Sequence, residues 1–255
     1  MQPAPVLPSV YNLVALESCG STNDEARRLA EEGAPEGTLV WALEQTAGRG
    51  RHGRTWASPH GNFYASLVLR PESPLKDAAQ LGFVAALAVF DTIGTLALAG
   101  LEVATKWPND VMITGRKVAG ILLESKGAAG PEAVPDYVIL GVGVNLINFP
   151  DKVDTPATCL SDEGANVLPV EFLEAFARHF LNWVRQWTDD GFEKVRRHWT
   201  FRCGHKDREI QVRLPNETVG GIFRGLDDTG AMLLETPAGT RTIAAGEVFF
   251  GPGTA

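Results

Sequence analysis

The stretch QTAGRGRHGRTW, residues 45–56, places Arg49, Arg51 and Arg54 within six positions of a chain that is acidic overall. It follows the strand-like segment 38–45, so we expect it to be a loop. Glycine lets backbone N–H groups come close to a ligand, and arginine offers a fork of donors that matches phosphate or carboxylate oxygens. The loop therefore predicts an anion site, with a solvated basic loop as the simpler alternative. It matches neither a Walker loop nor a dinucleotide-binding fingerprint.

Length, charge and cysteine content restrict the class of protein. The chain has 255 residues and a formal charge of −8, which suits one large domain with or without a small one and argues against general nucleic-acid binding. Cys19, Cys159 and Cys203 lie far apart without a C-x-x-C pair, which favours a reducing cytoplasm. We expect no signal peptide at 1–10, and a buried core helix rather than a membrane span in the apolar region 81–100.

The middle of the chain predicts an α/β domain. The segment 21–33 is expected to be a helix, with Thr22 and Glu25 as a capping box and Gly33 as its stop. The remaining elements follow from apolar periodicity and flanking turn residues. We expect strands at 38–45, 61–71, 117–127 and 136–148, and helices at 77–97 and 171–187.

The pattern of apolar and turn residues changes near residue 204. Short alternating segments are separated there by the turn signals PNE, DDTG and PAGT. We therefore predict a catalytic domain over 1–203 and a small β-barrel of SH3-like type over 204–255.

Three further motifs predict polar groups near a cavity. In KWPNDV, residues 106–111, a turn places Lys106 and Asp110 on either side of a bend. Lys117 begins an apolar strand, where its ammonium group points into a site or extends to the surface. In GVGVNL, residues 141–146, two glycines indicate close approach of another backbone or a ligand. Each motif alone is also explained by a turn, a surface lysine or packing.

The order of these motifs resembles that of the biotin–protein ligases. The similarity is carried by STND, EQTAGRGRHGRTW, GNFYASL, KWPNDV, KVAGILLE and GVGVNL, over about residues 15–150, and the C-terminal β module looks like the small domain of that family. The resemblance implies a mixed-sheet α/β fold akin to class II aminoacyl-tRNA synthetases. It also implies formation of biotinyl-adenylate from biotin and ATP with Mg²⁺, and transfer of biotin to a lysine of a biotin carboxyl carrier domain.

Site residues carry over position by position. The resemblance implies a catalytic set of Lys117, Arg49, Arg51 and Asp110. It implies biotin binding by Ser21, Thr22, Asn23, Gln45, Arg49, Gly50, Arg51, Lys117, Gly120, Ile121 and Leu122. It implies nucleotide binding by Arg49, Arg51, Arg54, Trp56, Asn109, Lys117 and Asn145. No residue is assigned as a metal ligand.

The residue types suit this chemistry. The biotin carboxylate and the α-phosphate are both anions, so Lys117 and the arginines would offset their repulsion. Ser21, Thr22 and Gln45 would satisfy the polar groups of the ureido ring. Asp110 would help to orient or deprotonate the acceptor lysine. The arginine loop would then act as a lid that excludes water.

The sequence departs from the family pattern in two places. His52 stands where members often have a further arginine. About twenty residues precede STND, too few for a helix-turn-helix domain, so we expect a cytoplasmic ligase that binds no DNA and has no repressor activity. Lipoate–protein ligase on the same fold is the nearest alternative function, followed by a non-catalytic binding module. The sequence leaves open a monomer or a homodimer.

Overall fold

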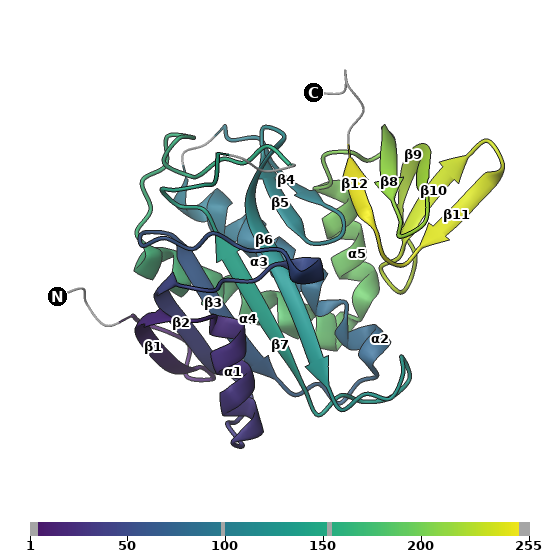
Figure 1. Ribbon diagram of the computed structural model, residues 1–255. Helices are drawn as coiled ribbons and strands as arrows, with labels where there is room; N and C mark the ends of the chain where they lie inside the picture. The colour runs from purple at the N-terminus through teal and green to yellow at the C-terminus, as the bar shows by residue number, and fades with distance from the viewer. Residues whose placement is uncertain (1–4, 98–99, 152–154, 250–255) are drawn as a thin grey trace.

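The structure is a computed structural model that describes residues 5–97, 100–151 and 155–249. The outer ends of the two predicted domains, and part of the region 81–100, therefore lie outside the described residues. Two sheets organise the chain (Figure 1).

The larger sheet is mixed, as the fold class predicts. In spatial order its strands are β1 (Asn12–Cys19), β2 (Thr38–Gln45), β3 (Phe63–Leu69), β7 (Tyr137–Val144), β6 (Arg116–Lys126), β5 (Asp110–Ile113) and β4 (Val103–Lys106). Strand β1 runs parallel to β2, and all other neighbours are antiparallel. The four strands predicted from apolar runs are confirmed. Strands β1, β4 and β5 were not predicted, since β1 is only partly buried and β4 and β5 have four residues each.

Helices cover both faces of this sheet. Helix α1 (Thr22–Glu31) lies on one face, and the long helices α3 (Leu81–Leu96) and α4 (Pro169–Asp190) lie on the other (Figure 1). Alternation along the strands explains the two cores. Val40 and Val68 pack beneath α1, while their neighbours Leu39 and Leu67 belong to the larger core.

Two details of the predicted helices are wrong. Helix α1 has Ser21 at its N-cap position without a side-chain cap bond, and the Thr22 hydroxyl donates to Gln45 instead of capping the helix. The predicted helix 77–97 is divided into α2 (Leu75–Ala78) and α3. The predicted helix 171–187 is confirmed within α4, which is followed by the unpredicted α5 (Phe192–Phe201).

The predicted C-terminal β module is a five-stranded antiparallel sheet. Its order is β11 (Gly239–Ile243), β10 (Met232–Thr236), β9 (Thr218–Leu226), β8 (Glu209–Arg213) and β12 (Glu247–Phe249). The module contacts the larger domain through Trp107, whose Nε1 donates to the carbonyl of Gly230 at 3.2 Å. This contact places the C-terminal sheet beside the KWPND turn.

The segment Leu75–Leu96 is long and apolar enough to cross a membrane by those criteria alone. Most of its residues are buried inside the protein, and Val84 to Val89 are fully covered. Helix α3 within this segment is therefore a core helix, as the sequence predicts.

Candidate functional site

A cavity of about 420 Å³ opens where the predicted motifs meet. Its lining comes from the start of α1, the end of β2, the arginine loop, the β4–β5 turn, β6, β7 and the C-terminal strand β12. Every residue that the sequence predicts as a site residue lies in this lining. Motifs separated by more than 100 residues along the chain thus form one site.

One end of the cavity carries a chain of polar side chains. The backbone N and Oγ1 of Thr22 donate to Gln45 Oε1 at 2.8 and 3.0 Å, and Gln45 Nε2 donates to Ser58 Oγ at 2.8 Å. Ser66 Oγ lies 2.7 Å from Thr22 Oγ1 and 2.6 Å from Asn23 Oδ1. These bonds fix the side chains in place. Ser66 belongs to the GNFYASL motif but was not assigned to the site.

The arginine loop folds back on itself as a small hairpin. The amide of Gly50 donates to the carbonyl of Arg54 at 2.7 Å, and the amide of Trp56 donates to the carbonyl of Gly48 at 2.9 Å. His52 at its tip has a left-handed φ of 56°, a conformation that histidine adopts more readily than most residues. The departure at position 52 is therefore compatible with the turn.

Two of the loop arginines reach across the cavity. Arg51 Nη1 donates to Asn109 Oδ1 at 3.3 Å, and Arg54 forms an ion pair with Glu247 of β12. Burial lowers the pKa of Arg51, an effect that the nearby Asp110 opposes. The hairpin thus connects the KWPND turn to the C-terminal domain.

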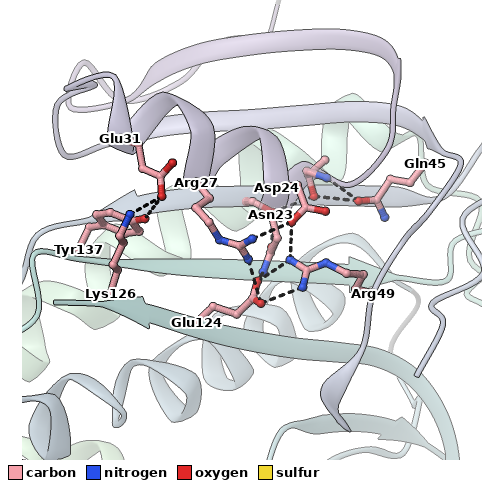
Figure 2. A network of polar contacts seen from close by, with 11 residues as sticks. Asn23, Asp24, Arg27, Glu31, Gln45, Arg49, Glu124, Lys126 and Tyr137 are labelled. Carbon is pink, nitrogen blue, oxygen red and sulfur yellow. Dashed lines mark hydrogen bonds and ion pairs between the residues drawn. The ribbon is translucent and has the colours of Figure 1, made fainter. Parts of the chain in front are cut away.

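Arg49 turns the other way. Its Nη1 and Nη2 donate to the two carboxylate oxygens of Glu124 at 2.9 Å each, and Nη2 also donates to Asp24 at 2.7 Å (Figure 2). Its Nε is buried without a partner among the described residues. The three arginines therefore line one cavity but have three different sets of partners.

Cations gather at the KWPND turn. Lys106 and Asp110 face each other across the β4–β5 hairpin, which confirms the predicted bend. Lys117 Nζ lies 2.5 Å from Asp110 Oδ1 and 5.3 Å from the ring centroid of Trp56. Lys106 is only 5% exposed, and burial lowers the pKa of its ammonium group. Lys106 lines the cavity although it was not among the predicted site residues.

The two glycines of GVGVNL are needed because side chains approach β7 closely. A Cβ at Gly143 would lie 2.5 Å from Trp56 Nε1, and a Cβ at Gly141 would overlap the amide of Asn23. A close approach to these glycines was predicted, but side chains of two predicted site residues make it, and not another backbone. Asn145 lines the cavity and also donates from Nδ2 to the carbonyl of Thr158 at 3.0 Å.

The C-terminal domain completes the cavity wall. Glu247, Val248 and Phe249 of β12 line it, although no residue of the β module was among the predicted site residues. The described residues contain no cluster of three or more His, Cys, Asp or Glu. Mg²⁺ is usually held by one or two carboxylates together with the phosphates of a bound nucleotide.

Comparisons with known proteins agree with this geometry. Residues 7–201 match the model of the biotin/lipoate A/B protein ligase family, and residues 205–251 match the biotin protein ligase C terminal domain. The chain is 45% identical to a biotin–[acetyl-CoA-carboxylase] ligase of Paracoccus denitrificans over 91% of its own length and 97% of the relative's. It is 37% identical to the bifunctional ligase/repressor BirA of Bacillus spizizenii, over 94% of this chain and 74% of the relative.

A solved structure has the same fold and a similar sequence. The biotin protein ligase from Aquifex aeolicus, in complex with biotin and ATP, superposes with a TM-score of 0.78 at 28% identity, over 93% of this chain and 97% of that one. Because the family model covers most of the chain and the motifs meet in one cavity, the chain belongs to the biotin/lipoate A/B protein ligase family.

Proposed function

We propose that this chain is a biotin–protein ligase that forms biotinyl-5'-adenylate from biotin and ATP and then transfers biotin to a lysine of a biotin carboxyl carrier domain. The observation that carries the proposal is the convergence of the arginine loop, the KWPND turn, Lys117 and the glycine strand on one cavity. Paired with the similarity to ligases of biotin, this set of residues suits an acyl-adenylate mechanism.

The polar end of the cavity suits the ureido ring. Ser21, Thr22 and Gln45 line this end and offer hydroxyl and amide groups that match one acceptor oxygen and two N–H donors. Ile121 and Val142 supply apolar wall for the fused rings and the valeryl chain. The carboxylate would then lie towards the cations of the KWPND turn.

The cationic end suits the first half-reaction. The biotin carboxylate attacks the α-phosphorus of ATP, and pyrophosphate leaves. Lys117, Arg51 and the unpredicted Lys106 would stabilise the charge that develops there. Mg²⁺ would arrive with the triphosphate, for the reason given above. In the second half-reaction the neutral amine of the carrier lysine attacks the carbonyl carbon, AMP leaves, and Asp110 would orient that amine.

The setting of the reaction follows from the same proposal. We propose a cytoplasmic enzyme that acts as a monomer or homodimer, with the carrier domain as its protein partner. Repressor activity, named for some relatives, is not part of the proposal, because a chain with a formal charge of −8 offers no argument for a basic DNA-binding face.

The decisive experiment is intact mass spectrometry of a carrier domain after incubation with the protein, ATP, Mg²⁺ and biotin. We expect a shift of one biotinyl group, and none when ATP is omitted. A parallel reaction with lipoate distinguishes the two ligase types of the family. Labelling by lipoate alone, or no labelling with either acid, would contradict the proposal.

Gly143→Ala is expected to weaken nucleotide binding. The new Cβ would displace the Trp56 indole from the cavity wall, and overpacking of about 1.4 kcal/mol corresponds to a roughly 10-fold rise in the KM for ATP. The KM for biotin should change less. Gly94→Ala is the control, because a Cβ there meets nothing within 4 Å. Equal KM values for ATP in the two variants would mean that Trp56 does not border the nucleotide.

A further inference from the structure

Glu124 of β6 bonds to two residues of the cavity lining, Asn23 and Arg49, although Glu124 itself does not line the cavity. Its Oε2 accepts from Asn23 Nδ2 at 2.7 Å, and its two oxygens accept from Arg49 at 2.9 Å each (Figure 2). Arg27 of α1 adds an ion pair at 3.0 Å. Among the described residues, Glu124 is not part of the cavity lining, so its influence would pass through Asn23 and Arg49.

The bond from Asn23 connects Glu124 to the polar end of the cavity, which suits the ureido ring. Asn23 Oδ1 lies 2.6 Å from Ser66 Oγ, which lies 2.7 Å from Thr22 Oγ1, and Thr22 donates to Gln45. A chain of short contacts therefore runs from Glu124 to the side chains that suit the ureido group. Asn23 is 4% exposed, so a lost partner would leave its amide unsatisfied.

The Arg49 branch leads to the loop. Arg49 begins the hairpin in which it pairs with Thr55 and in which Gly48 accepts from Trp56. Fixing the Arg49 guanidinium at both Nη atoms fixes the start of this hairpin, and with it the placement of Arg51 and Trp56. The two parallel bonds to one carboxylate are a geometry that gives arginine pairs directional strength.

We infer that Glu124 is a positioning residue that couples the arginine loop to the ring-binding end of the cavity, so that the loop holds its place over a bound biotinyl-adenylate. The inference rests on the function proposed above. Burial of Glu124 raises the pKa of its carboxyl group, but the bonds from Asn23 and Arg49 outweigh this and lower it. Glu124 therefore remains ionised at neutral pH and keeps both branches.

A simpler explanation is that Glu124 only attaches α1 to the sheet. Glu31 provides the matched comparison, because it also joins α1 to β6. It accepts from Lys126 of β6 at 2.6 Å and from Tyr137 of β7 at 3.1 Å, at the other end of the helix (Figure 2). In the described structure Glu31 contacts neither the arginine loop nor Asn23. Attachment of α1 to the sheet is therefore the only role that it has in common with Glu124.

The experiment compares Glu124→Gln with Glu31→Gln in the full chain. Labelled biotinyl-adenylate is formed on the enzyme without carrier and chased with unlabelled biotin and ATP, and its release is timed. For Glu124→Gln we expect release about 10-fold faster than in the parent, as for one lost charge-assisted bond, with a raised KM for biotin and an adenylation kcat within about 2-fold. Glu31→Gln should match the parent in all three.

Equal release from the two variants would overturn the inference. A parent enzyme that forms no adenylate would instead overturn the proposed function, so the two failures are distinct. The release rates of Arg49→Ala and of its double variant with Glu124→Gln test the coupling, since residues that act together are not additive. We expect the double variant to release adenylate at nearly the rate of Arg49→Ala, and multiplication of the two single effects would overturn the inference.

Folding is followed by thermal unfolding of each variant. If Glu124→Gln does not fold, Arg49→Lys tests the same link, because lysine keeps the charge but cannot form two parallel bonds. Faster adenylate release from Arg49→Lys supports the inference. Release at the parent rate overturns it.

Discussion

Lys117→Ala is expected to lower the rate of adenylate formation roughly 10²–10³-fold, which corresponds to the loss of one preorganised donor worth about 3–4 kcal/mol in the barrier. The ammonium group lies 2.5 Å from Asp110 and above the ring of Trp56, so it is already held before substrates bind. Binding of biotin should weaken less, because the contacts among Thr22, Gln45 and Ser58 do not involve Lys117.

Pre-steady-state measurement of adenylate at saturating ATP and biotin tests this prediction. Lys117→Arg should restore only part of the rate, since the planar guanidinium is larger and directs its donors differently. Lys126→Ala on the same strand is the control, because Lys126 pairs with Glu31 on the surface, away from the cavity. If Lys117→Ala formed adenylate at a rate within a few-fold of the parent, Lys117 would be only a strand residue that packs against Trp56.

Much of the fold follows from local sequence. The segments 38–45 and 136–148 are nearly continuous apolar runs with turn residues beside them, and both form largely buried interior strands of the sheet, β2 and β7. Gly141 and Gly143 were predicted to admit a close approach, and the indole of Trp56 lies where a side chain at Gly143 would stand. Local pattern therefore identified the strands that form the floor of the cavity.

Contacts between distant residues could not be predicted in the same way. Thr22 and Glu25 have the spacing of a capping box, yet the Thr22 hydroxyl bonds to Gln45, 23 residues away. Arg49 lies in a loop whose composition is typical of anion binding, yet its Nη atoms bond to Glu124, 75 residues away. A local sequence pattern describes what a side chain does with residues near it in the chain. In both cases a residue distant in the sequence is the hydrogen-bond partner instead.

The contribution of the C-terminal domain was missed for a related reason. Its turns and alternation describe a self-contained sheet, so nothing local in 204–255 indicates that β12 reaches the cavity. The ion pair between Arg54 and Glu247 makes that link, and two oppositely charged residues nearly 200 positions apart are not a recognisable pattern. Only the tertiary structure shows that these two residues are in contact.

His205 is expected to make the stability of the protein fall steeply in mild acid. The side chain is 1% exposed and lies against Phe223, with ring centroids 4.9 Å apart, at the start of the C-terminal domain. Burial lowers its pKa to about 3 from an ordinary value of 6.5, and the nearby positive charges of Lys106 and Arg208 act in the same direction. The folded protein therefore keeps this histidine neutral at pH values where an exposed one is charged.

The sign of the effect follows from proton binding. Between pH 6.5 and 3 the unfolded chain binds a proton at this position and the folded chain does not, so acid favours unfolding. The stability that His205 contributes is complete above its unfolded pKa and is lost as the pH falls towards the folded value. Between pH 7.5 and pH 5 the free energy of unfolding should decrease by about 2 kcal/mol from this group alone.

Denaturant unfolding of the parent and of His205→Gln at both pH values measures this contribution. Glutamine does not titrate, so the variant should lose about 2 kcal/mol less than the parent over the same interval, whatever its stability at pH 7.5. Carboxylates that also titrate, such as Glu124 and Glu247, are present in both proteins and cancel in the comparison. His60→Gln, at an exposed position, should keep the parent's pH dependence. An unchanged loss in His205→Gln would mean that the buried imidazole takes up its proton without unfolding the chain.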